Sequence, residues 1–146
     1  MEQTQTKSVD VLNSFLRGEM SAVETYRQAL EAIEQSTARE SLKECMRSHE
    51  ARVQVLSDRI RSIGGNPVKQ SGVWGAFAKI AEGGAKLFGD KAAIAALEEG
   101  EDHGRDDYRR DIGKLDIDSR ALLESQVIPQ QQRTHRTVSD LKKAMH

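Results

Sequence analysis

Four side chains of metal-binding type stand where helical segments of this sequence should carry apolar residues. Glu19 and Glu101 each interrupt an apolar stripe, and His49 and His135 lie on or beside the stripes of two other segments. Carboxylates and imidazoles that converge in the core of a helical bundle are the ligands of non-haem iron and manganese centres. A bound cation would also offset the free-energy cost of burying unpaired carboxylates. These four residues are therefore candidate ligands for one iron or manganese ion.

The same positions also allow an interpretation without metal. Glu19 and Glu101 could form buried pairs with arginine or tyrosine, and a histidine on an apolar face is more often a hydrogen-bonded core residue than a ligand. Tyr26 and Tyr108 are expected to pack in the core with their hydroxyls at its rim. The sequence leaves both interpretations open.

The expected register of the helices adds second-tier candidates. With the first interhelical loop centred near residue 37, His49 lies opposite Tyr26 or Glu24. It is roughly 10 Å along the bundle axis from Glu19, at a rise of about 1.5 Å per residue. Glu24 and Glu50 would then be the nearer carboxylates. Gln132 is the further candidate in the second half of the chain.

Four long segments with helical periodicity must position these residues. Their apolar side chains recur at alternating steps of three and four residues, which places them on one face of a helix. Gly64-Gly65-Asn66-Pro67 should end the second segment, because glycine tolerates the left-handed conformation and proline cannot continue a helix. The expected main helices are 8–35, 38–63, 91–112 and 119–145.

Local signals predict where these helices start and bend. Thr37, with Glu40 three residues later, has the form of a capping box at the start of the second helix. Asp90 and Asp118 are suited to cap the third and fourth helices at their N-termini. Pro129 lies inside the fourth helix and predicts a kink there.

Residues 68–89 have a weaker pattern and are expected to form a long crossover. Trp74 and Phe77 fall in this stretch, and we expect them to cover one end of the bundle rather than to form a partner surface. One long crossover lets the second and third helices run parallel, as in ferritin-type bundles. We therefore predict an all-α, ferritin-like four-helix bundle formed by a single domain, residues 1–146.

The two halves of the chain resemble each other. The first helix of each half shares a Gly-Glu pair and a Tyr-Arg pair, both at a constant offset of 82 residues. In the second helix of each half, residues 46–49 resemble residues 132–135 at an offset of 86. A duplicated helical hairpin is the simplest explanation. The shared pairs are Gly18-Glu19 with Gly100-Glu101, and Tyr26-Arg27 with Tyr108-Arg109.

Several features occur in a fixed order between about Val11 and Met145. They are Gly18-Glu19, Ile63-Gly64-Gly65, the crossover with Trp74, and Leu97-Glu98-Glu99-Gly100-Glu101 leading to Tyr108. In this order and spacing the sequence resembles a bacterial family of ferritin-like four-helix proteins whose function is unassigned. The resemblance implies the ferritin-like fold and carries over no particular activity.

The sequence departs from the metal-binding pattern of the ferritin-like superfamily at two positions. That pattern places Glu-x-x-His on the second helix of each hairpin, and here Met46 and Gln132 replace the glutamates. A paired-metal centre would lack its bridging carboxylates, so we expect a mononuclear or a degenerate site. The expected function is a non-catalytic binding or structural module with a degenerate metal site. The alternative is an iron- or manganese-binding protein with a redox or storage-related role.

Composition argues against several other classes of protein. The formal net charge of -1, from 22 basic and 23 acidic residues, gives no electrostatic reason to expect a nucleic-acid partner. No apolar run approaches the roughly 20 residues that a membrane span needs, and the segment Met1–Lys7 is too polar for a signal peptide. The single cysteine, Cys45, allows no intrachain disulfide, so we expect a cytoplasmic protein. A homo-oligomer and a protein partner remain open.

Overall fold

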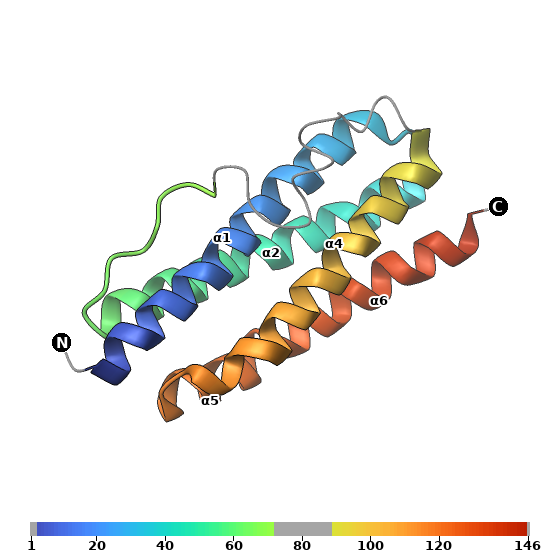
Figure 1. The fold of residues 1–146 in the computed structure, drawn as a ribbon. Coiled ribbons are helices and arrows are strands. Elements are labelled where there is room, and N and C mark those ends of the chain that lie inside the picture. The colour runs from blue at the N-terminus through green and yellow to red at the C-terminus, as the bar shows by residue number, and fades with distance from the viewer. Residues whose placement is uncertain (1–2, 72–88, 146) are drawn as a thin grey trace.

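The computed structural model describes residues 3–71 and 89–145, which contain helices and no β-strand (Figure 1). The prediction of an all-α chain is confirmed for these residues. None of their helices is both long and apolar enough to cross a lipid bilayer. The helices are α1 (Gln3–Ala32), α2 (Ser36–Ser62), α4 (Gly89–Asp111), the short 3-10 helix η2 (Ile112–Lys114), α5 (Ile117–Gln126) and α6 (Ile128–Ala144).

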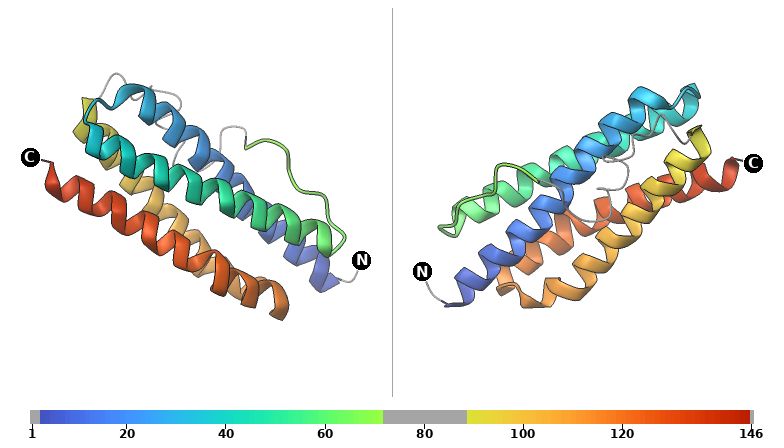
Figure 2. Two further views of the ribbon diagram at one scale, coloured as in Figure 1. Left: turned by 180° about the vertical axis from the view of Figure 1, so that it is seen from behind. Right: turned by 45° about the horizontal axis from the view of Figure 1, so that its top comes forward.

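Two antiparallel helical hairpins pack against each other (Figures 1 and 2). Helices α1 and α2 form the first hairpin, and α4 with α5 and α6 forms the second. Helix α1 contacts both α2 and α4, and α6 contacts both α4 and α2. Helices α2 and α4 run in the same direction, as Figure 1 shows. Most of the predicted crossover, 68–89, including Trp74 and Phe77, lies outside the described residues.

The turn between α1 and α2 is held by side chains from other parts of the chain. The N-cap residue of α2, Gln35, makes no side-chain capping bond, so the predicted capping box at this boundary is wrong. Asp90 of α4 instead accepts hydrogen bonds from the backbone N–H groups of Glu34 and Gln35, both at 3.2 Å. The guanidinium of Arg39 donates to the carbonyls of Leu30 and Ile33 at the end of α1. These contacts end α1 earlier than its periodicity predicts.

The fourth predicted helix is two helices in the structure. Asp116, rather than Asp118, is the N-cap of α5, and its carboxylate accepts a 3.0 Å hydrogen bond from the N–H of Ser119. The helix then breaks at Val127, and Pro129 falls in the first turn of α6. Proline is tolerated there because the first helical N–H groups have no partner within the helix. The predicted kink is therefore a helix boundary.

Two glycines that follow α2 let the chain pack closely against the N-terminal part of α1. Gly64 has a φ of +89°, which confirms the predicted left-handed residue after the helix. Gly65 packs so closely against α1 that a Cβ at this position would lie 2.7 Å from the side chain of Val9. Only a residue without a side chain fits this approach.

The apolar core has two parts, and Glu19 lies between them on α1. Burying a large aliphatic or aromatic side chain contributes about 1.5–3 kcal/mol, so both parts hold the helices together. One cluster packs around the part of α1 that precedes Glu19. It consists of Leu12, Phe15, Leu16, Leu56, Ile60, Tyr108, Leu115, Leu123 and Val127. The other cluster packs around the part of α1 that follows Glu19. It consists of Ala22, Tyr26, Ala29, Leu30, Ile33, Ala38, Leu42, Cys45, Ala93, Ile94, Leu97 and Val138.

Candidate functional site

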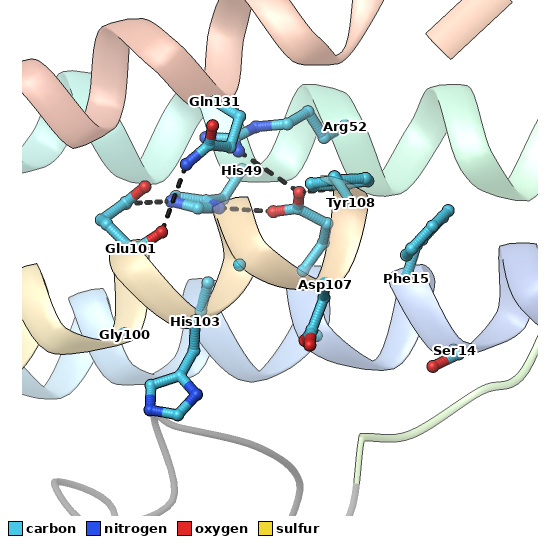
Figure 3. A pocket seen from close by; sticks show the side chains of 14 residues that line it. Ser14, Phe15, His49, Arg52, Gly100, Glu101, His103, Asp107, Tyr108 and Gln131 are labelled. Carbon is cyan, nitrogen blue, oxygen red and sulfur yellow. Dashed lines mark hydrogen bonds and ion pairs between the residues drawn. The ribbon is translucent and has the colours of Figure 1, made fainter. Parts of the chain in front are cut away.

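His49 of α2 lies between two buried carboxylates and contacts both of them (Figure 3). Its Nδ1 is 2.5 Å from Oε1 of Glu19 on α1, and its Nε2 is 2.8 Å from Oε2 of Glu101 on α4. All three side chains are buried between the two apolar clusters. The structure thus brings together three of the four candidate ligands that were named from the sequence.

The expected register of the first hairpin is wrong. The turn between α1 and α2 is centred on Glu34 rather than near residue 37. Glu19 and His49 lie equally far along the chain from Glu34, so an antiparallel hairpin places them opposite each other. The predicted axial gap between them does not exist. Glu24 and Glu50, which that register favoured, are exposed on the outside of the hairpin.

Arg52, one helical turn after His49, completes the charge balance of the core. Its Nη1 lies 3.3 Å from Oε2 of Glu19, and its Nη2 donates a 2.8 Å hydrogen bond to the hydroxyl of Thr134. That hydroxyl in turn donates to Oε1 of Glu101 at 2.9 Å. Arg52 is only 1% exposed. With His49 protonated, two carboxylates face one imidazolium and one guanidinium, and the cluster is neutral.

Two tyrosines complete the hydrogen bonding of the cluster. Each tyrosine comes from one half of the chain and contacts the glutamate of the other half. The hydroxyl of Tyr26 donates to Oε2 of Glu101 at 2.5 Å, and the hydroxyl of Tyr108 donates to Oε2 of Glu19. Both rings are buried, and both hydroxyls lie within the core. The expectation that these hydroxyls reach the rim of the core is therefore wrong. Every carboxylate oxygen of both glutamates accepts at least one hydrogen bond.

The contacts between α2 and α6 follow the internal repeat. Ser48 donates a hydrogen bond to Gln130, and Arg52 donates one to Thr134, and each pair is separated by 82 residues. These two contacts fit an offset of 82 in the second helices, the same as in the first, whereas the resemblance of residues 46–49 to residues 132–135 has an offset of 86.

With an offset of 82, Gln131 rather than His135 corresponds to His49. Gln131 is buried, and its side-chain amide donates a 3.2 Å hydrogen bond to the backbone carbonyl of Glu101. His135 instead lies with its Nε2 2.5 Å from Oδ1 of Asp102, in a partly exposed contact between α4 and α6. Gln132 is exposed. The structure therefore places His135 and Gln132 apart from the buried carboxylates.

The buried charges stabilise one another strongly enough to overcome desolvation. Burial alone would raise the pKa of Glu19, but the charges of Arg52 and His49 outweigh it and lower that pKa to about 2. Burial also opposes the ionised form of Glu101, and contact with His49 lowers its pKa below the usual range. For His49, burial and Arg52 favour the neutral ring, but Glu101 and Glu19 together raise its pKa. Each of these pKa shifts favours the charged form of its group.

A small cavity lies beside this network, between α1 and α4 (Figure 3). Its volume is about 40 Å³, and three glycines, Gly18, Gly100 and Gly104, form part of its wall. A Cβ added to Gly18 or Gly104 would meet open space. A cavity of this size holds one or a few water molecules, whereas pockets for organic ligands usually measure about 300–1,000 Å³. It therefore has room for water-sized molecules next to the network.

The buried donors are arranged to bind one another rather than a cation. Both ring nitrogens of His49 face carboxylates, whereas a metal ligand needs a nitrogen lone pair directed at the metal. Arg52 brings a fixed positive charge against Glu19. Within residues 3–71 and 89–145, no group of three or more His, Cys, Asp or Glu side chains is arranged to hold a metal ion. The residues as placed do not fit a metal centre.

Three members of the network were not predicted from the sequence. Arg52 follows His49 by three residues, which places both side chains on one face of α2. Gln131 and Thr134 have the same spacing on α6. This spacing, together with the offset of 82, is the signal that could have identified all three.

One protein family matches most of the chain. The family model described as a domain of unknown function (DUF2383) matches residues 7–114. The matched part includes α2 and α4 with nearly all of α1, and it therefore contains Glu19, His49, Arg52 and Glu101. The search of curated proteins finds no match.

Proposed function

The chain belongs to the family of the domain of unknown function DUF2383, and we propose that it is a ferritin-like, non-catalytic binding module with an ion network in place of a metal centre. The observation that carries this proposal is the position of His49, which contacts both buried glutamates while Arg52 balances the remaining charge. The site is thus a degenerate one, with a protonated histidine and an arginine at the centre of the bundle.

Charge balance supports this proposal. A divalent cation that bound His49 together with Glu19 or Glu101 would have to displace the proton from one ring nitrogen of His49. It would also stand close to the guanidinium of Arg52, and like charges repel strongly in a buried, weakly polar environment. A cation is not needed to offset the burial of the carboxylates, because the two protein cations already do so.

The protonation states support a non-catalytic role. A general acid or base is most effective when its pKa lies near the working pH. The pKa of Glu19 is lowered to about 2, and burial raises the pKa values of Tyr26 and Tyr108 well above the usual range for tyrosine. The adjacent cavity has room for water and not for an organic substrate. The network instead stabilises the fold, because its directed hydrogen bonds form only when α1, α2, α4 and α6 have one particular alignment.

Metal analysis tests this proposal directly. The full chain is purified without a tag from cells grown with added iron and manganese, and its metal content is measured. We expect metal far below one equivalent, and no rise in melting temperature on addition of Fe(II), Mn(II) or Zn(II). Near-stoichiometric metal that is lost in H49Q but retained in E50Q, a surface control on the same helix, would refute the proposal.

A second candidate function is binding of iron or manganese with a redox or storage-related role. The observation in its favour is the convergence of Glu19, His49 and Glu101 beside a water-sized cavity. It requires His49 to lose the proton of one ring nitrogen and Arg52 to move away from Glu19 when the metal binds. The metal analysis therefore decides between the two functions.

A further inference from the structure

A groove between α4 and α6 gathers basic side chains on the surface of the second hairpin. Its volume is about 530 Å³, which lies in the range of pockets for small organic ligands, about 300–1,000 Å³. The buried residues Tyr108 and Gln131 contribute to its lining, so the groove reaches down to the core. Asp140 is its one acidic lining residue, whereas four are Arg or Lys: Arg105, Arg109, Arg136 and Lys143.

Three of these four cations form no ion pair within residues 3–71 and 89–145. Arg105 pairs with Asp102 and Asp106. In contrast, no ion pair joins Arg109, Arg136 or Lys143 to any residue that the structure describes. The like charges repel one another across the groove, and an anion bound between them would relieve this repulsion.

Some other surface arginines are paired, and the exposed Arg27, Arg47 and Arg133, which form no ion pair with the described residues, do not line this groove. Arg61 pairs with Asp58, Arg110 with Asp107 and Asp111, and Arg120 with Glu124, each with a neighbour on the same helix. A second groove, between α1 and α2, has Glu24 and Glu50 against the single cation Lys69. The groove between α4 and α6 is therefore more positively charged than the groove between α1 and α2.

We propose that this groove binds a small phosphorylated molecule, with Arg109 and Arg136 as its principal phosphate contacts. A guanidinium presents paired N–H groups that match two oxygens of a phosphate, which a point charge does not. The groove is larger than a single phosphate needs, which favours a diphosphate or a phosphorylated organic molecule. This inference rests on the proposed binding module and names the class of ligand it takes.

Titration with inorganic pyrophosphate, followed by amide resonances of the full chain, tests the inference. We expect shifts confined to residues 105–109 and 131–143, and weaker binding as ionic strength rises. The variant R109Q/R136Q should bind at least about tenfold more weakly, since hydrogen bonds to charged groups are lost. Both arginines are exposed and unpaired within the described residues, so this variant should keep its fold. The control R61Q/R120Q has the same net charge and should bind like the unaltered protein.

Three results would overturn the inference. They are no site-specific shift with pyrophosphate, equal weakening in R61Q/R120Q, and an affinity for citrate that equals the affinity for pyrophosphate. The first two exclude the groove as a site, and the third excludes phosphate as the group it recognises. None of these results alters the metal content of the protein, so failure here is distinguishable from failure of the metal-free core.

Discussion

The hydroxyl of Tyr26 lies 2.5 Å from Oε2 of Glu101 and donates a hydrogen bond to it across 75 residues of sequence. Tyr108 stands in the same relation to Glu19. Each half of the chain therefore supplies the tyrosine that binds the glutamate of the other half. His49 joins the two glutamates between these contacts. The two hairpins are held in register by a polar layer as well as by apolar packing.

Removing either tyrosine hydroxyl should destabilise the fold by a similar amount. Y26F and Y108F keep the rings, including the contact of Tyr108 with Phe15 at a centroid distance of 4.5 Å. Each should lower the free energy of unfolding by about 1.5–3 kcal/mol, the range for a hydrogen bond to a charged group. Urea unfolding measures both losses. A loss below about 0.5 kcal/mol in either variant, the size of an ordinary surface change, would contradict the reciprocal arrangement.

Arg52 should be the most sensitive single position of the polar layer. R52M keeps much of the side-chain volume but leaves Glu19 buried without its guanidinium, which should cost about 3–5 kcal/mol of unfolding free energy. The double variant R52M/E19Q should recover part of this loss, because it also removes the unpaired charge. R61M, an exposed control on the same helix, should change stability little. Equal stability of R52M and R61M in chemical unfolding would show that Arg52 does not balance the core.

The stability of the fold should decline on both sides of a mildly acidic optimum. Glu19 has a pKa of about 2 when folded and 4.5 when unfolded, so its contribution is complete above pH 4.5 and is lost as the pH falls toward 2. The folded pKa of His49 is raised above 6.5, so its contribution is complete below pH 6.5 and is lost as the pH rises through the folded pKa. Each group contributes a slope of at most about 1.4 kcal/mol per pH unit.

Unfolding free energies measured across this pH range test both limbs. H49Q should remove the alkaline decline that His49 causes, and E19Q should reduce the acidic decline. An alkaline limb that is unchanged in H49Q would mean that His49 does not carry its extra proton in the folded protein.

The close approach of α1 to the end of α2 should make Gly65 intolerant of any side chain. G65A places a Cβ 2.7 Å from the side chain of Val9 and should cost about 1–3 kcal/mol, as for other overpacked sites. G65A/V9A should restore stability by removing the clash. G18A is the matched control: its Cβ meets open space, and alanine should stabilise the interior of α1 by up to about 1 kcal/mol. Thermal unfolding of the set would refute this packing if G65A were as stable as G18A.

Helix positions were predictable from the sequence, but their ends were less so. The stripe along α2 depends only on the local pattern of apolar residues, and the expected helix 38–63 differs little from the observed Ser36–Ser62. The start of α2 depends on Asp90, which comes from a distant part of the chain and satisfies the backbone at Glu34 and Gln35. A capping signal read from neighbouring residues cannot include such a partner.

Part of the candidate site was also predictable, for the same kind of reason. Glu19, Glu101 and His49 interrupt apolar stripes, and the structure buries all three. Arg52 was missed because a long basic side chain on a helix is usually solvated, and its burial depends on acceptors from other helices. His135 was selected because residues 132–135 resemble residues 46–49 locally. The contact of Arg52 with Thr134 fits an offset of 82 instead.

The ring nitrogens of His49 provide the most direct test of the proposed ion network. Nitrogen-15 spectra of the metal-free protein at neutral pH, with H49Q to assign the signals, report how many protons this ring carries. An imidazolium bound to Glu19 and Glu101 predicts that both nitrogens are protonated and that added Zn(II) leaves their resonances unchanged. A neutral ring whose unprotonated nitrogen shifts on addition of Zn(II) would contradict the account and identify His49 as a metal ligand.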